Sequence, residues 1–286
     1  MTDMIELSHG TGGIFNAPFR PELMRVWSVM NRSSEISALD ELYNGLDQPK
    51  RRPGLSGNTR IAFGFDTNAI YRIGLNGTRG DNAVDYLRQN KGPVIIPGQV
   101  IQETWNNALS GVQPKASKVR KKLEELRQEM AGIGQHTGEL GERVQDALED
   151  FTRLHGQWID PDSAKNFDRT LSVLRDVAAT SYVPRLQFYQ LAKVRKETKT
   201  PPGFKDDASN YGDFFVWADF LYGLAKVEPT DIDAVVMVTN DKKPDWSRGG
   251  VAHPLLVAEA VSISGVPFRL WDLNDFEAHA TKILNG

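Results

Sequence analysis

The chain has 286 residues, with 34 lysines and arginines against 37 aspartates and glutamates, a net charge of -3 and 40% hydrophobic residues. These values are ordinary for a globular protein, and the length suits one α/β domain with appended segments. Because there is no cysteine, disulfides, thiolate zinc sites and cysteine nucleophiles are excluded.

No apolar run approaches the ~18 residues that span a bilayer. The amino-terminal sequence MTDMIELSHGTGG lacks the basic and apolar regions of a secretion signal. We therefore expect a soluble, cytoplasmic protein without a membrane partner. The nearly neutral charge neither indicates nor excludes a nucleic-acid substrate, because a modest basic patch is compatible with it.

Residues 1–58 predict a helical extension followed by a linker. Apolar residues at helical spacing follow Pro21: Leu23, Val26, Trp27 and Met30. Ser34 can cap a second helix that carries Ile36, Leu39 and Leu42. The basic stretch DQPKRRPGLSGNTR then indicates a linker. Such short helices either pack on the main domain or contact a partner.

From residue 59 the pattern becomes α/β. IAFGF (61–65) and PVIIP (93–97) predict buried strands, and GDNAVDYLRQN (80–90) and GQVIQETWNNAL (98–109) predict helices. This alternation favours parallel strands joined by right-handed crossovers.

Residues from about 114 to 198 interrupt the alternation and predict a helical insertion. Two charged helices with apolar residues at spacings of three and four are separated by GIGQHTG (132–138), which is typical of an antiparallel hairpin. A further helix is indicated by Leu171, Leu174 and Val177. The alternation then returns with a helix at 211–227, a strand at 233–241, a helix stopped by Gly265 and a last strand at 266–273.

Four acids lie where a parallel sheet binds its ligands. Asp66 and Asp241 follow predicted strands, Glu103 lies in the first turns of a helix, and Asp213 begins an apolar helix beside Gly212. The carboxyl ends of parallel strands meet at one edge of the sheet, so these acids can converge. Each one alone could instead cap a helix or complement its dipole.

Metal chemistry gives a reason to group the four acids. Mg²⁺ and Mn²⁺ prefer oxygen ligands, and in two-metal phosphodiester hydrolases the ions sit ~3.5 to 4 Å apart. Without cations, clustered carboxylates would repel one another and at least one pKa would rise. The sequence therefore predicts a site for divalent cations.

Five segments carry a resemblance to a known family. FDTNAIY, VIIPGQVIQETWNN, TPPGFKDDASNYGDFFVW, VVMVTNDKKPDW and LWDLNDFEAHA together resemble bacterial PIN-like proteins over roughly residues 60–284. The resemblance implies an α/β PIN-like fold at 59–286, a parallel sheet flanked by helices with the helical insertion at about 114–198. It also implies a metal-dependent endonuclease that acts most often on RNA, with relatives in phage defence and toxin-like contexts.

Position by position, the resemblance implies that Asp66, Glu103, Asp213 and Asp241 are the metal-binding and catalytic acids. Asp206 is a further catalytic candidate, and Lys205 and Asp245 lie beside the site. The subfamily's basic residue in the loop after the last acid is missing, since this chain has His253 in VAHPLL, which puts one phosphate contact in doubt.

Substrate contacts are expected from Asn68, Lys205, Lys242 and Lys243, although each lysine could serve solubility alone. Trp105 and Trp246 could stack on bases or could simply pack in the protein. The five histidines lack ligand-like spacing, HGTGG is not a P-loop, and Asn68 stands where a haloacid-type phosphatase needs an aspartate.

Three functions remain open at this point: a metal-dependent ribonuclease, a structure-specific DNA nuclease, and a non-catalytic scaffold that binds a partner protein. A nuclease in the cytoplasm needs restraint. We therefore expect a regulatory protein partner, an ATPase or an antitoxin, that contacts the amino-terminal helices or the insertion.

Overall fold

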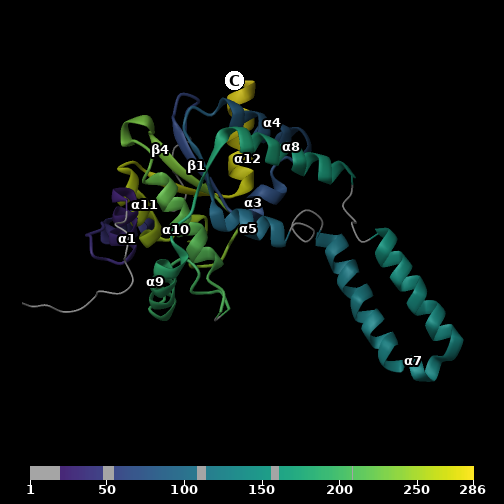
Figure 1. Cartoon of the computed structure of the whole chain (residues 1–286). Helices are drawn as coiled ribbons and strands as arrows, with labels where there is room; N and C mark the ends of the chain where they lie inside the picture. Colours follow the sequence, from purple (N-terminus) through teal and green to yellow (C-terminus); the bar gives the residue numbers. More distant parts are fainter. Residues whose placement is uncertain (1–19, 48–54, 108–113, 156–160, 208) are drawn as a thin grey trace, which may run out of the picture.

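The computed structural model describes residues 20–47, 55–107, 114–155, 161–207 and 209–286. Its centre is a five-stranded, fully parallel sheet of order β3-β2-β1-β4-β7 (Figure 1). The strands are β1 (Ile61–Phe65), β2 (Val94–Pro97), β3 (Ala178–Ser181), β4 (Ala234–Val238) and β7 (Phe268–Trp271). A short antiparallel hairpin joins β5 (Ser247–Arg248) to β6 (Val251–Ala252). The parallel alternation expected from the sequence is confirmed.

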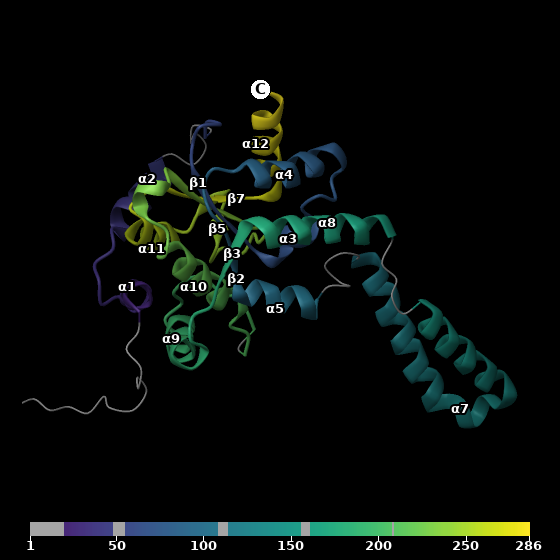
Figure 2. The same cartoon turned by 45° about the horizontal axis from the view of Figure 1, so that its top comes forward.

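Helices cover both faces of the sheet (Figures 1 and 2). One face carries α3 (Thr67–Arg72), α4 (Gly77–Gln89), α8 (Pro161–Val177) and α12 (Leu273–Asn285). The other carries α1 (Pro21–Met30), α9 (Arg185–Glu197), α10 (Gly212–Leu224) and α11 (Pro254–Ser264), with α2 (Ala38–Asp47) packed on α11. The remaining helices are α5 (Gly98–Asn106), α7 (Pro114–His155) and the 3-10 turn η1 (Pro229–Asp231).

The central strand β1 shows how the two layers are built. Side chains alternate between the faces of a strand. Phe63 and Phe65 both point to one face, where their rings meet Phe276 of α12 at 5.3 Å. Gly64 points to the other face, where a Cβ atom would lie 2.3 Å from the ring of Phe220 in α10. The apolar strand is therefore buried on both sides, and glycine lets α10 approach closely.

The amino-terminal helix α1 is part of the body of the protein. Its apolar residues Leu23, Val26, Val29 and Met30 are buried in the core. Arg195 of α9 donates to the Met30 carbonyl oxygen (3.1 Å) and to the buried Glu259 of α11 (2.8 Å). The predicted first helix is confirmed, and the second helix begins at Ala38, so that Ile36 precedes it. The predicted linker falls partly on residues 48–54, which lie outside the described residues.

The expected helical insertion is shorter than residues 114–198. Residues 178–181 form strand β3 at the edge of the sheet, and α8 and α9 pack against the body. The sequence AATS of β3 is only partly buried and has no apolar run that would mark it as a strand. Among the described elements, α7 is the one that projects, as a hairpin that turns at Gly138 (φ 54°), within the predicted GIGQHTG segment (Figure 2).

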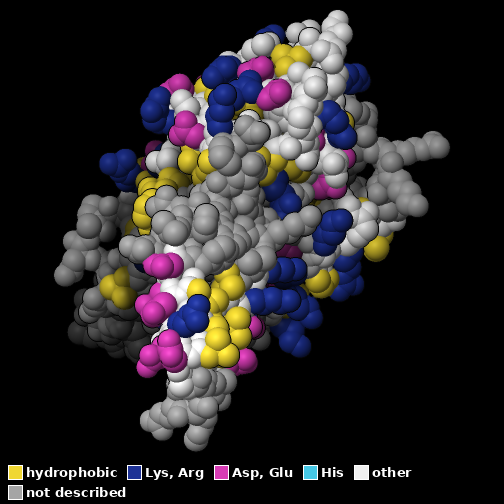
Figure 3. Space-filling view, turned by 90° about the vertical axis from the view of Figure 1, so that its right-hand side faces the viewer, with side chains coloured by type: hydrophobic (Ala, Val, Ile, Leu, Met, Phe, Trp, Pro, Cys, Tyr) yellow, Lys and Arg dark blue, Asp and Glu magenta, His cyan; other side chains and the backbone are white. Residues whose placement is uncertain are grey.

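The face from which α7 projects carries basic, acidic and hydrophobic side chains intermixed (Figure 3). Leu126 and Leu140 of α7 are exposed, and Arg127 pairs with Glu149 across the hairpin at 3.9 Å. Within the described ranges, no helix combines the length and the apolar character that crossing a membrane requires.

Candidate active site

Five carboxylates gather at the carboxyl edge of the parallel sheet. Asp66 follows β1, Asp241 follows β4, Glu103 lies in α5 directly after β2, and Asp213 lies in the first turn of α10. Asp206, from the segment before α10, completes a group that we call the carboxylate cluster. The fold thus brings the four predicted acids and Asp206 to one edge.

Asp66 is a helix cap and a member of the carboxylate cluster at the same time. Its Oδ1 accepts a hydrogen bond from the Thr67 backbone N (2.7 Å), and its Oδ2 accepts one from the Thr239 hydroxyl (2.8 Å). Burial raises the pKa of Asp66 to about 7, and the charges of Asp213 and Glu103 add to the rise. These contacts fix both oxygens of a carboxylate that has a high cost of ionisation.

Glu103 is held from two sides. Its Oε2 accepts from the Thr67 hydroxyl (2.8 Å), and its Oε1 accepts from the Gln99 amide (3.0 Å). A Cβ atom at residue 212 would lie 2.6 Å from Glu103 Oε1, so any larger residue at Gly212 would push the Glu103 carboxylate out of its present position. Thr67 follows Asp66 directly, and it links the two acids.

Lys243 lies inside the carboxylate cluster. Its ammonium nitrogen is 2.5 Å from Asp206 Oδ1, 2.6 Å from Asp213 Oδ2 and 3.0 Å from Asp241 Oδ2. Burial lowers the pKa of Lys243, but the hydrogen bonds to Asp206, Asp213 and Asp241 outweigh it and raise the pKa above its usual value. One permanent positive charge therefore neutralises part of the cluster.

Asp213 is also bound by Trp246, whose indole N–H donates to Asp213 Oδ2 at 2.9 Å. Burial raises the pKa of Asp213 to about 6, and the hydrogen bond from Lys243 opposes the rise. Trp246 is 1% exposed and packs edge-on against Trp217. The packing interpretation of Trp246 is therefore confirmed, and base stacking is excluded by its burial.

Two buried acids brace the loops of the site. Asp245 Oδ2 accepts from the backbone N of Gly203 (2.9 Å) and Lys205 (3.1 Å), which positions the segment that carries Asp206. Asp219 accepts two hydrogen bonds of 2.8 Å from Arg185. It also accepts from the backbone N of Gln99 (2.9 Å) and Val183 (2.7 Å), after β2 and β3.

Sequence reasoning did not single out Asp219. A second acid in the almost wholly apolar helix α10 was the available signal, because a buried carboxylate needs partners. Burial raises the pKa of Asp219, and the hydrogen bonds from Arg185 oppose the rise. Its contacts are with Arg185 and with loop backbone, which makes it a support for the strand ends.

The expected substrate contacts lie around the carboxylate cluster. Asn68, Lys205 and Lys242 are exposed, whereas Lys243 is engaged by three carboxylates. Trp105 of α5 is 85% exposed. These positions are accessible to a substrate, and the roles of the residues stay predictions.

The donor set fits a hard divalent cation in its chemistry. All five side chains offer carboxylate oxygens, and Asp206 Oδ2 is buried without a hydrogen-bond partner. Within the described part of the chain, however, no three acidic or histidine side chains are already arranged around one metal position. Lys243 supplies positive charge among three of the acids, so its ammonium occupies the space that a cation bound by Asp206, Asp213 and Asp241 would take.

Comparison with known proteins identifies one family. A family model described as a PIN like domain matches residues 62–255, which contain all five members of the carboxylate cluster. Neither a curated protein nor a solved structure shows significant similarity to the chain. The parallel sheet flanked by helices agrees with the fold that the resemblance implied.

Proposed function

The chain belongs to the PIN-like domain family, and we propose that it is a metal-dependent endonuclease that hydrolyses phosphodiester bonds in RNA by a two-metal mechanism. The carboxylate cluster at the carboxyl edge of the sheet carries this proposal. Acids that are distant in sequence and crowded in space, with the pKa of Asp66 raised to about 7 and that of Asp213 to about 6, are typical of a site that binds cations.

Asp66, Glu103, Asp206, Asp213 and Asp241 would hold Mg²⁺ or Mn²⁺. When bound, such ions polarise a phosphodiester, acidify water and stabilise the leaving oxygen. The chain itself supplies orientation. Thr67 and Thr239 fix the two oxygens of Asp66, and Thr67 and Gln99 fix those of Glu103. Outer contacts of this kind set ligand direction at metal sites.

Lys243 balances charge in the cluster and can follow the substrate. Its ammonium is bound to Asp206, Asp213 and Asp241, and it would leave these acids when they serve as cation ligands. The displaced ammonium can then contact a phosphate. The exposed Lys205 and Lys242 flank the same acids in sequence and would contact the backbone of the nucleic acid, while Asn68 lies at the start of α3.

A role in phage defence or as a toxin, in the cytoplasm, belongs to the same proposal. A regulatory partner, an ATPase or an antitoxin, would restrain the nuclease. The hairpin α7, which projects from the α/β body and exposes Leu126 and Leu140, would offer such a partner a surface.

A cleavage panel tests the function. Single-stranded RNA, single-stranded DNA and duplex or flap DNA are incubated with the protein in Mg²⁺, Mn²⁺ or chelator. We expect cation-dependent cleavage of RNA, reduced about 100-fold or more in Asp66→Asn and Asp241→Asn, because each change removes a charged ligand. Asp233→Asn is the matched control, since Asp233 is exposed, precedes β4 at the opposite edge of the sheet and pairs with Arg60.

Preferential cleavage of flap or duplex DNA would identify DNA as the substrate instead of RNA. The proposed metal-dependent hydrolysis of phosphodiester bonds would stand. Cleavage that survives both Asp66→Asn and Asp241→Asn would overturn the assignment of the cluster. Absence of cleavage on every substrate, with unchanged function of Asp66→Asn in cells, would favour the non-catalytic scaffold.

A further inference from the structure

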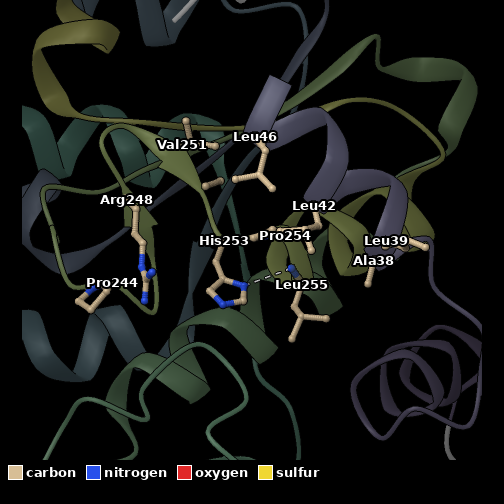
Figure 4. Close-up of a pocket in the computed structure, with 12 residues that line it drawn as sticks. Ala38, Leu39, Leu42, Leu46, Pro244, Arg248, Val251, His253, Pro254 and Leu255 are labelled. Carbon is tan, nitrogen blue, oxygen red and sulfur yellow. Dashed lines mark hydrogen bonds between the residues drawn. The ribbon is translucent and has the colours of Figure 1, made fainter. Parts of the chain in front are cut away.

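A groove of about 800 Å³ lies outside the carboxylate cluster, between α2, the β5–β6 hairpin and the start of α11 (Figure 4). We call it the hairpin groove. The lining residues used below are Leu39, Leu42, Leu46, Arg248, His253 and Leu255. Its volume falls in the range of small-molecule sites, which is ~300 to 1,000 Å³.

The hydrocarbon wall of the groove comes mainly from α2. Leu39, Leu42 and Leu46 are spaced by three and four residues, so they lie along one face of the helix. Leu39 is 78% and Leu46 is 74% exposed, and Leu255 of α11 contributes to the same lining. Leucines that line a concave site while exposed to water gain stability when an apolar ligand covers them.

The opposite part of the groove carries two hydrogen-bond donors. Figure 4 shows the guanidinium of Arg248 beside Pro244, and the ring of His253 between Arg248 and Leu255. The two groups are close enough for the charge of Arg248 to lower the pKa of His253, after burial, which is the larger cause. Among the described residues, no acceptor binds the guanidinium of Arg248, which is exposed.

His253 presents a donor because of its own hydrogen bond. Its Nδ1 accepts from the Leu255 backbone N at 3.2 Å, where His253 caps α11. In a neutral imidazole the proton must then lie on Nε2, which is free to donate. A carboxylate is the group that matches an arginine beside a second N–H donor.

We propose that the hairpin groove is a binding site for a soluble apolar organic anion. Its hydrocarbon part lies on the leucines of α2 and on Leu255, and its single carboxylate is bound by Arg248 and His253. Charge complementarity selects this occupant: an alcohol leaves the guanidinium without an anion, and a cation is repelled by it. The site does not depend on the proposed nuclease activity, because no member of the carboxylate cluster lines it.

Calorimetric titration of the full chain tests the site. The probes share one hydrocarbon chain and differ in the head group: decanoate, decan-1-ol and decylammonium. We expect decanoate to bind at one site, and the alcohol and the ammonium to bind about tenfold more weakly or worse. Arg248→Gln should weaken decanoate about tenfold or more and leave decan-1-ol unchanged.

Two further variants separate the parts of the site. Leu42→Asn should weaken decanoate and decan-1-ol alike, because it removes apolar lining. Arg88→Gln is the control, since Arg88 is also exposed but pairs with Asp85 in α4, far in sequence from the groove, and it should change neither titration.

Equal affinity for decanoate and decan-1-ol, no effect of Arg248→Gln, or absence of decanoate binding would each overturn the proposal. So would binding only to vesicles that contain anionic lipid, because the groove would then belong to a membrane surface. Cleavage of RNA by the same preparation is assayed separately. A failure to bind decanoate would therefore leave the test of nuclease activity unaffected, and a failure to cleave RNA would leave the test of the hairpin groove unaffected.

Discussion

At the scale of single residues, threonine hydroxyls hold the acids of the carboxylate cluster, since Thr67 donates to Glu103 and Thr239 donates to Asp66. Asp66 and Asp241 were recognisable because they follow apolar strands. Thr239, which donates to Asp66 and accepts from the Asp241 backbone N at 3.0 Å, has no such signal. The neighbouring Lys242 and Lys243 are indistinguishable by pattern, yet one is exposed and the other lies among carboxylates. The path of the loop backbone determines which of the two lysines points into the carboxylate cluster, and that path depends on tertiary contacts.

The raised pKa of Asp66 predicts a pH dependence of stability. Its pKa is about 7 in the folded chain against a usual 3.8, so the folded state holds the proton more tightly than the unfolded state. In chelator, the free energy of unfolding should therefore fall as the pH rises from about 4 to about 7, and Asp66→Asn should make that slope shallower, while the raised pKa of Asp213 keeps part of it. Urea unfolding across this range measures it.

Asp233→Asn again supplies the control. Hydrogen bonds from Arg60 lower the pKa of Asp233 to about 2. The contribution of Asp233 to the free energy of unfolding is therefore almost fully present above about pH 4. In Asp233→Asn, the free energy of unfolding should fall with pH as steeply as in the unsubstituted chain. Parallel slopes for the unsubstituted chain and Asp66→Asn would show that Asp66 ionises without penalty.

At the scale of elements, strongly patterned segments were predictable and weakly patterned ones were not. The apolar runs of β1, β2 and β4 and the periodic helices α1, α4 and α10 lie where the sequence indicated. The edge strand β3 was missed because it is short and half exposed. The last helix, α12, carried a usable signal, since Asp272 and Asp275 form a reciprocal capping box.

Two glycines make opposite predictions. Gly64→Ala should destabilise the protein by about 1 to 3 kcal/mol, because its Cβ would lie 2.3 Å from Phe220 in a closely packed core. Gly45→Ala in α2 should stabilise it by about 0.5 to 1 kcal/mol, since the nearest neighbour lies at an ordinary 3.4 Å and alanine favours a helix. Urea unfolding of both variants checks the signs, and destabilisation by Gly45→Ala would contradict the placement of α2.

At the scale of the whole molecule, the hairpin α7 stands apart from the α/β body (Figure 1). Its two halves are charged on most faces and paired across the hairpin by Arg127 and Glu149. The sequence indicated this hairpin because its apolar residues keep a helical period. It could not show where the insertion ends, since α8 has the same kind of pattern but packs on α4.

Replacing residues 114–155 by a short Gly/Ser linker should leave the body folded. Shortening a flexible connection changes the loop-closure cost by only about 1 kcal/mol, and the sheet keeps its contacts. We expect a melting temperature within a few degrees of the full chain, measured by circular dichroism at 222 nm together with tryptophan fluorescence. Loss of the cooperative unfolding transition in tryptophan fluorescence would show that α7 is required for the α/β body to fold.

The strand order has a consequence for biosynthesis. The central strand β1 has β2 on one side and β4 on the other, and β4 lies at 234–238, late in the chain. While the ribosome is still translating the preceding residues, one edge of β1 has no partner and Asp66 has neither Thr239 nor Asp241 beside it. A polypeptide that ends before residue 241 therefore lacks a complete set of acids, and any catalysis by the carboxylate cluster requires synthesis of the chain through Asp241.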